Sequence, residues 1–498
     1  MSKLSKKELQ RISDALTPTT EKAPEVKVLY PIGAGLDIPT GVFLKGTDGQ
    51  YYLNGGLGTS TGITGKGNSF KSTIGHFFTL SMLNRLASCG IKSSELMYDT
   101  EINIHLSTLT NFLKRFKHLK DFIKTGRWTI TDKTVMKGDE FHNELKRTFK
   151  EKVAKKIKIP TPFFNLDESG AFDVTPPHTN KIDSLTVFDT TNIANLQEEI
   201  DLGDKKALTL PMRQGLEKSR FLSWLPTAAT NAGAYVVTTA HMAKDIPMES
   251  GPMAPRPEKK LSTMKPGVRI KGVTDAYLYL ISNLWETVVS RPLINRTTKA
   301  PEYPIDSTDN SIEGNDLYLV TINLLRSKSG PSGTLITLII SQSEGVLPTL
   351  SEFNAVKDNK RFGLTGNDIN YVMTLYPEVK LSRTKVRNLI DTDHRLRRAI
   401  NITAELLQLR IFQRLYWGSI WMDPAALYEA IIEKGYSWEK ILDSRGWWSL
   451  NNDANETPYL CIIDLLLMAN GKVDRNEFKT GANSDTDATE HKRSDDKK

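Results

Sequence analysis

The stretch 62-GITGKGNSFKSTIGHFF-78 decides how the rest of the chain is interpreted. Residues 65–72 match the phosphate-binding pattern G-x-x-x-x-G-K-[ST] except at the sixth position, where Phe70 replaces a glycine. Backbone N–H groups and a helix N-terminus hold phosphate in such loops, the lysine reaches the outer phosphates, and the hydroxyl binds Mg²⁺. Apolar residues then recur at helical spacing, so the loop opens a helix. The stretch therefore predicts a nucleotide site, and the alternative is a glycine-rich turn that opens an ordinary helix.

Composition limits the classes of protein that fit. The chain has 498 residues, with 66 Lys and Arg against 58 Asp and Glu, a formal net charge of +8. A basic balance is compatible with a polyanionic partner, although basic surfaces are also common without one. No apolar run is long enough to cross a membrane, and the N-terminus lacks an apolar signal core. Two distant cysteines give neither a disulfide framework nor metal-ligand spacing. We therefore expect a cytoplasmic protein with no membrane partner.

Strand-like and helix-like segments alternate through the first two thirds of the chain, which predicts an α/β fold with a mostly parallel twisted sheet flanked by helices. The expected strands include "ELMYD" (95–99), "SLTVFD" (184–189), "AYVVTTAH" (234–241), "AYLYLISN" (276–283) and "DLYLVTINLL" (316–325). A polar segment, 158–181, is interpreted as a surface insertion, and a long helix at 212–231 is expected to be interrupted by Pro226.

The predicted organisation has four parts. They are an N-terminal helix and linker at 1–25, a core at 26–350, a separate, mainly helical domain at 351–478, and a disordered tail at 479–498. The helical domain carries a basic stretch that either contacts duplex DNA or is a solvated helix face. Its members are Arg383, Lys385, Arg387, Arg395, Arg397 and Arg398.

Two acidic positions complete the candidate site. Asp189 closes "SLTVFD", where a strand-terminal acid would hold Mg²⁺ through water, and the alternative role is a helix cap. Glu101 follows "ELMYD", where a carboxylate can orient or deprotonate water beside the γ-phosphate, with Asp99 as the second choice. The alternative for this pair is a solvated acidic turn.

Five motifs in the same order resemble the RecA-like recombinases, and most closely their phage UvsX branch. They are "GKGNSFKS" (65–72), which carries the branch's Phe, "YDTEINI" (98–104), "VFDTTNIANL" (187–196), "VVTTAH" (236–241) and "LLRSKSG" (324–330). The resemblance covers about 30–345 and implies a RecA-like P-loop ATPase core. We expect the ring of Phe70 to pack beneath the loop while the backbone faces phosphate.

The resemblance implies a role for each matching residue. Lys71 and Ser72 serve phosphates and Mg²⁺, Glu101 is the catalytic carboxylate, and Asp189 is the second Mg²⁺ residue. His241 senses the γ-phosphate, while Arg326 and Lys328 reach the ATP of a neighbouring protomer. Without the resemblance, a satisfied sheet-edge histidine and a solvated strand end describe these last three residues. The expected nucleotide contacts are Gly65, Lys66, Gly67, Asn68, Ser69, Phe70, Lys71, Ser72, Thr73 and Asp189.

Two segments correspond to the DNA-binding loops of the family, at about 197–213 and 242–272. Such loops would follow a phosphate backbone without sequence preference, and the alternative is ordinary charged surface. Their basic residues are Lys205, Lys206 and Arg213 in the first and Lys259, Lys260, Lys265 and Arg269 in the second.

The leading functional hypothesis is a DNA-dependent ATPase and strand-exchange recombinase that uses ATP and Mg²⁺. It would form helical filaments on single-stranded DNA, engage duplex DNA, and act in homologous recombination, repair and recombination-dependent replication. Single-strand-binding and loader proteins are the further expected partners. The alternatives are a hexameric replicative helicase of the DnaB type and a non-hydrolysing RecA-like accessory protein. For a phage-encoded chain, the compartment would be the host cytoplasm.

Overall fold

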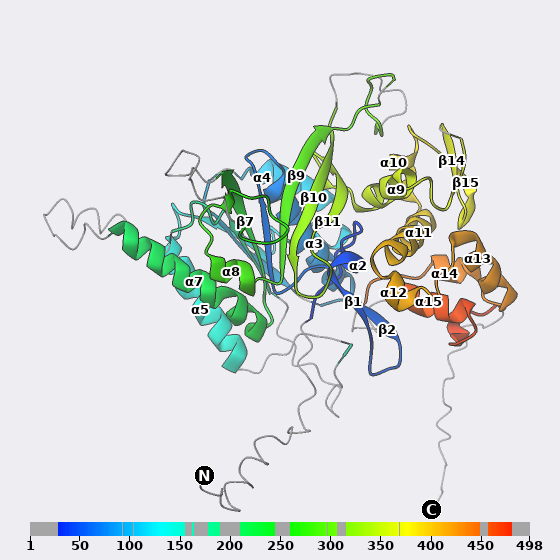
Figure 1. The fold of residues 1–498 in the computed structure, drawn as a ribbon, viewed down its shortest axis with the longest axis horizontal. Helices are drawn as coiled ribbons and strands as arrows, with labels where there is room; N and C mark the ends of the chain where they lie inside the picture. Colours follow the sequence, from blue (N-terminus) through cyan, green and yellow to red (C-terminus); the bar gives the residue numbers. More distant parts are fainter. Residues whose placement is uncertain are drawn as a thin grey trace, which may run out of the picture.

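The computed structural model describes residues 28–154, 162–163, 178–189, 210–244, 259–305, 315–448 and 457–480, apart from 92, 103, 296 and 368. A large sheet stands between helices on its two faces, and the C-terminal helices lie beside its antiparallel end (Figure 1). The predicted α/β class, with a mostly parallel sheet flanked by helices, is confirmed. The expected N-terminal helix at 1–25 lies outside the described residues.

Within the described residues the main sheet has ten strands, in the order β12-β11-β10-β9-β3-β7-β6-β4-β5, with β8 paired to β7. Neighbours from β9 to β5 run parallel, whereas β10, β11 and β12 continue the sheet antiparallel. Parallel strands bring their carboxyl ends to one edge, so the segments after β3, β4, β6 and β7 meet there. The strands are β3 Ser60–Gly65, β4 Ser94–Asp99, β5 Trp128–Asp132, β6 His178–Asp183, β7 Tyr235–Lys244, β8 Val268–Ile270, β9 Asn283–Pro292, β10 Leu317–Ser327, β11 Thr334–Ser341 and β12 Gly345–Val346.

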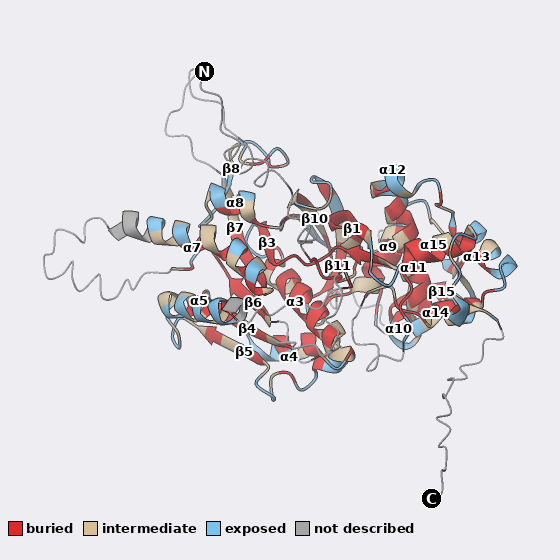
Figure 2. Ribbon diagram, turned by 90° about the horizontal axis from the view of Figure 1, so that it is seen from below, coloured by how far each residue is buried: buried red, intermediate tan, exposed pale blue. Residues whose placement is uncertain are grey.

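Successive side chains along a strand point to opposite faces of the sheet, and each face packs against its own layer of helices. Tyr235 and Val237 of β7 pack in the cluster that contains the apolar residues of α3, whereas Val236 packs with those of α5 and α7. Figure 2 shows the resulting buried interior between exposed outer helix faces. The helices of these layers are α3 Lys71–Ser88, α4 Leu106–Lys114, η1 Lys117–Leu119, α5 Gly138–Ala154, α7 Leu210–Ala232 and α8 Asp275–Leu280.

Three expectations about the core are wrong. "SLTVFD" is not a strand: β6 begins at His178, inside the supposed surface insertion at 158–181, and ends at Asp183, and a turn comes after it. "AYLYLISN" is mostly helix α8, because Thr274 caps its first turn by accepting the N–H of Tyr277. Its end begins β9, which the sequence did not reveal. Pro226 does not interrupt α7, which continues through it.

The domain boundary at 351 stays a prediction, and the C-terminal region shares a buried cluster with the core. Its helix α11 (His394–Phe412) contributes Ile402 and Leu406 to the same buried cluster as Ile74 and Phe78 of α3. It also contains a three-stranded sheet that was not predicted. Its elements are α9 Pro348–Asp358, β13 Leu364–Gly366, β14 Asn370–Met373, β15 Tyr376–Ser382, α10 Val386–Thr392, α11, α12 Arg414–Trp417, α13 Pro424–Glu433, α14 Trp438–Leu442, α15 Ile462–Ala469 and η3 Asn476–Phe478.

The N-terminal segment lies between the main sheet and the C-terminal region and contacts both (Figure 1). It consists of α2 Asp37–Thr40 and a hairpin of β1 Val42–Lys45 with β2 Tyr51–Asn54. Gln413 donates to the carbonyls of Ile38 and Gly41 at 3.1 and 3.0 Å, and Trp448 donates to Leu53 at 3.0 Å. At the other end of the region, Lys479 forms a β-bridge with Tyr436. The expected tail lies outside the described residues from 481 onward.

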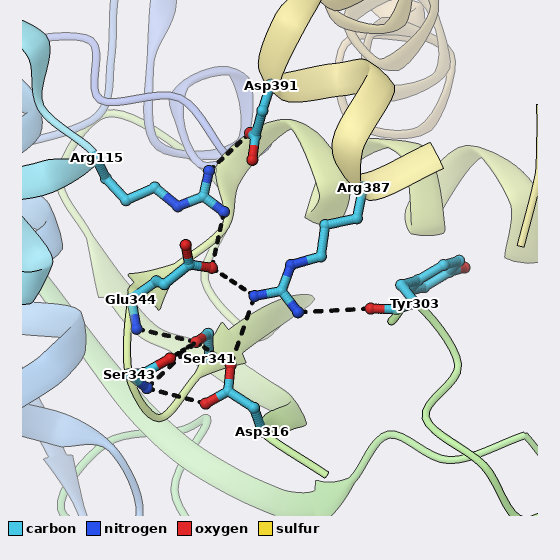
Figure 3. Close-up of polar contacts among 8 residues, drawn as sticks. All are labelled: Arg115, Tyr303, Asp316, Ser341, Ser343, Glu344, Arg387 and Asp391. Carbon is cyan, nitrogen blue, oxygen red and sulfur yellow. Dashed lines mark hydrogen bonds and ion pairs between the residues drawn. The ribbon is translucent and has the colours of Figure 1, made fainter. Parts of the chain in front are cut away.

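A polar cluster lies at the contact between the core and α10, and it includes Arg387 of the basic stretch (Figure 3). Arg387 is 5% exposed and pairs with Glu344 and with Asp316, while Arg115, just after α4, pairs with Glu344 at 3.0 Å and Asp391 at 2.7 Å. Arg383, Arg395, Arg397 and Arg398 likewise hold protein carbonyls or carboxylates. All five arginines of the stretch therefore bond to groups of the protein, Arg387 and Arg398 are buried, and Lys385 is exposed. Contact with duplex DNA stays a prediction.

Buried carboxyl groups beside this interface predict a pH-dependent stability. Burial and then the charge of Glu405 raise the pKa of Glu352 to about 8; Asp37 adds to the rise, while Asn401 and Arg85 oppose it. A pKa above its unfolded value means that the folded protein binds the proton more tightly, so this contribution is complete below pH ~4.5 and disappears as the pH rises through about 8.

We therefore expect Glu352→Gln to raise the melting temperature relative to wild type at pH 8.5 and to raise it much less at pH 5.5. Thermal unfolding at both values tests this expectation. An equal shift at both pH values would contradict it, because a change in packing alone does not depend on protonation.

Candidate functional site

The 65–72 segment has the strand–loop–helix arrangement that a phosphate loop requires: β3 ends at Gly65 and α3 begins at Lys71. A Cβ on Gly65 would stand 1.8 Å from Thr287 Oγ1, so only glycine fits there. Phe70 is in the left-handed region with φ 62°, and its ring lies 5.1 Å from the ring of Tyr318. The aromatic side chain therefore packs against β10, at the cost of a backbone conformation that glycine adopts more easily.

Internal contacts hold the loop closed around one carbonyl. Lys71 Nζ and Ser69 Oγ both donate to the Lys66 carbonyl oxygen at 2.7 Å. Burial lowers the pKa of Lys71, and the negative charges of Asp183 and Glu101 oppose that effect. The ammonium group thus lies close to both acids and could exchange the Lys66 carbonyl for a phosphate oxygen.

Asp183, at the end of β6, is the acid that reaches the loop. Its Oδ2 accepts from Lys181 Nζ at 3.1 Å, its Oδ1 accepts from Thr239, and Ser72 also hydrogen-bonds to it. Burial alone would raise the pKa of Asp183, but Lys181 and these hydroxyl donors hold it well below its usual range. Asp183 is therefore a carboxylate in contact with Ser72.

Asp189 does not occupy the position expected of it. It comes six residues after the strand end, and its backbone oxygen lies against Gly138 at the start of α5. Its charge acts on Lys218 of α7 and on Tyr98. The acid at the end of the strand beside the loop is therefore Asp183, and the sequence had assigned this position to Asp189.

Glu101, in the turn after β4, and His241, on β7, meet. The imidazole Nε2 of His241 lies 3.1 Å from Glu101 Oε1, and the two side chains are 29% and 30% exposed for Glu101 and His241 respectively. His241 is directly opposite Gly65 in the pairing of β7 with β3, so the pair stands beside the loop. Asp99 has a structural role, because its carboxylate accepts the N–H groups of Glu101, Ile102 and Ile104 and thereby shapes this turn.

The other predicted residues do not join this cluster. Arg326 donates to the Tyr279 carbonyl at 2.8 Å, and Lys328 donates to the Leu280 carbonyl, both at the end of α8. Of the predicted DNA-binding residues, Lys205 and Lys206 lie outside the described residues, as does the side chain of Arg213.

Part of the second predicted DNA-binding segment is described. Lys260 pairs with Asp275 at 3.1 Å, and Arg269 lies in β8, which pairs with the end of β7. Lys265 is close enough to Glu286 for its charge to lower the pKa of that acid, which burial raises. Lys259, the first described residue after the gap at 245–258, adjoins Lys260. This segment therefore begins on the strand that carries His241.

The residues missed from the sequence are those that surround Asp183. Lys181, Thr239 and His76 are buried polar groups, and "HTNKID" has none of the apolar alternation by which strands are recognised. The usable signal was the acid at the end of a short segment directly before an apolar run.

The donor set fits a hard divalent cation bound together with phosphate. A hydroxyl on Ser72 and a carboxylate on Asp183 are oxygen ligands of the kind that Mg²⁺ takes alongside substrate phosphates and water. Within the described residues, no three His, Cys, Asp or Glu side chains converge as a protein-only metal site. The arrangement therefore suits a metal that arrives with a nucleotide.

Comparisons with known proteins leave the family open: no family model matches the chain, and no curated protein matches it. Among the described helices, none has the length and apolar character needed to cross a membrane.

Proposed function

We propose that this chain is a DNA-dependent ATPase with a RecA-like P-loop core, which assembles on single-stranded DNA and exchanges strands. The observation that carries the proposal is that Lys71, Ser72, Asp183 and the Glu101–His241 pair meet at one edge of the parallel sheet. ATP hydrolysis needs a phosphate cradle with a fixed cation, oxygen ligands for a metal, and a group that orients water.

Each residue has a definite part in the proposed reaction. Backbone N–H groups of the loop and Lys71 hold the phosphates, and Mg²⁺ held through Ser72 and Asp183 would neutralise charge on the β and γ oxygens. Glu101 orients the attacking water and accepts its proton. The His241 contact at 3.1 Å fixes the direction of that carboxylate.

The DNA-dependent part of the proposal is supported by the basic residues beyond His241. β7 continues through Lys244, and the described end of the next segment carries Lys259, Lys260 and Lys265. A change at the γ-phosphate that moved His241 would therefore act on a basic segment suited to a phosphate backbone. The net charge of +8 agrees with such a partner.

Filament assembly would give Arg326 and Lys328 their proposed roles. Both cations now hold carbonyl oxygens at the end of a helix. In an assembly they would exchange these neutral acceptors for the phosphate oxygens of ATP bound by the adjacent protomer, and hydrolysis would then depend on assembly.

A pair of aspartate variants tests the site. We expect Asp183→Asn to lower Mg²⁺-dependent ATP hydrolysis by about 10- to 100-fold, because it removes a carboxylate that orients the metal. Asp189→Asn should stay within about twofold of wild type. ATP hydrolysis is measured with and without single-stranded DNA.

The same assays separate this proposal from its rivals. Equal losses in the two variants would contradict the assignment of Asp183. Absence of hydrolysis in wild type with intact DNA binding would favour an accessory protein. Closed rings with unwinding activity, seen by electron microscopy and a helicase assay, would favour the helicase.

A further inference from the structure

A buried lysine, Lys181, contacts Asp183, the acid proposed to help hold the metal ion. Lys181 is fully buried, and its Nζ lies 3.1 Å from Asp183 Oδ2 and 3.1 Å from His76 Nε2. Burial lowers the pKa of His76 well below its usual value, and the charge of Lys181 lowers it further, so a neutral imidazole accepts from the ammonium. A buried ammonium is costly unless it is paired, so the burial of Lys181 beside Asp183 indicates a role other than filling space.

The fold makes room for this side chain. A Cβ on Gly75 of α3 would stand 2.8 Å from Lys181 Cε, so the absence of a side chain at 75 lets the lysine stem pass beneath the helix. Lys181 and Asp183 are two residues apart on β6 and therefore point to the same face, toward α3. The helix that begins in the phosphate-binding loop and the strand that carries the acid thus fit each other at this point.

Three elements together fix the carboxylate of Asp183. Lys181 of β6 engages Oδ2, Thr239 of β7 engages Oδ1, and Ser72 donates from the first turn of α3. Of the three donors only Lys181 is charged, and its side chain is fully buried. Its removal would leave Asp183 with two hydroxyl donors and an uncompensated charge.

We propose that Lys181 is a positioning residue, which holds the carboxylate of Asp183 from inside the sheet in the orientation that serves the nucleotide's metal ion. This inference rests on the proposed ATP site. The Nζ of Lys181 bonds to His76 and Asp183, so it acts on the metal through Asp183.

The test separates metal-dependent from metal-free nucleotide binding. ATP affinity is measured by calorimetry in Mg²⁺ and in EDTA for wild type and for Lys181→Met, which keeps the length and apolar stem of the side chain. We expect the affinity in EDTA to stay within about twofold, because the loop itself is intact, and the Mg²⁺ enhancement to fall about tenfold or more. A purely structural role would weaken binding equally under both conditions.

Lys218→Met is the matched control, because Lys218 contacts the Leu185 carbonyl just beyond the same strand and donates there instead of to Asp183. It should keep the full Mg²⁺ enhancement. If Lys181→Met does not fold, Gly75→Ala supplies the test, since its new methyl group displaces the lysine stem and should reduce the same enhancement.

A third variant checks the route through Asp183. The double variant Lys181→Met/Asp183→Asn should lose no more enhancement than Asp183→Asn alone, because both changes act on one carboxylate. Full enhancement in Lys181→Met, or additive losses in the double variant, would overturn the inference while the ATP site stands. No ATP binding by wild type in either condition would overturn the site, and the inference with it.

Discussion

Replacement of Glu101 by Gln should lower ATP hydrolysis by about 10²–10⁴-fold while ATP binding stays near the wild-type value. The amide oxygen can still accept from His241, which lies 3.1 Å from Glu101 Oε1, so the geometry beside the loop is kept. The amide cannot take a proton from water, and the substitution also removes the negative charge that raises the pKa of Lys71. Single-turnover hydrolysis and equilibrium ATP binding measure the two effects separately.

A carboxylate elsewhere on the core serves as the control for Glu101. Glu144 of α5 makes an exposed pair with Arg147 at 2.6 Å, and Glu144→Gln should leave hydrolysis within about twofold of wild type. If Glu101→Gln hydrolyses ATP at the wild-type rate, another group orients the water. If it also loses ATP binding, the carboxylate is needed for the site's structure, and the proposed chemical role is contradicted.

The parts of the site that sequence alone located are those marked by local chemistry. A loop that requires Gly65, followed by Lys71 and Ser72, keeps its spacing even with Phe70 in place of glycine. Glu101 and His241 could be placed because Glu101 follows β4 and His241 lies in the last part of β7, and such strand ends meet at one edge of a parallel sheet.

Asp183 could not be located in this way, because its strand, β6, buries polar side chains instead of an apolar run. β6 places Lys181 and Asp183 in the interior and pairs them with each other, so the segment has a polar sequence. The apolar run after it, 184–189, forms a turn whose Leu185 and Phe188 pack into the core. Hydrophobic patterning identified the packing residues and missed the strand beside them.

The packing of the regions before and after residue 351 against each other could not be predicted for a related reason. Helices do predominate after residue 351, but composition does not show which apolar faces pack together. Ile402 and Leu406 of α11 complete a cluster that begins with Ile74 of α3. The two regions therefore share one interior, and the phosphate-loop helix is supported in part by the C-terminal region.

The polar cluster of Figure 3 should make a large contribution to the stability of this shared structure. We expect Arg387→Met to lower the free energy of unfolding by about 2–3 kcal/mol, between the values for exposed and fully buried ion pairs. Arg387 is 5% exposed, whereas its partners Glu344 and Asp316 are 32% and 24% exposed. The loss comes chiefly from carboxylates left with fewer donors. Urea unfolding followed by tryptophan fluorescence measures it.

Two further variants identify the cause of that loss. Arg395 belongs to the same basic stretch but pairs with Asp443 at the surface, so Arg395→Met should cost less than about 1 kcal/mol. Adding Glu344→Gln to Arg387→Met should recover part of the stability, because it removes the charge that lost its partner. Arg115 would keep a neutral acceptor in the double variant, since its Nη2 lies 3.0 Å from Glu344 Oε2. Equal costs for Arg387→Met and Arg395→Met would show that the cluster adds no more than a surface pair.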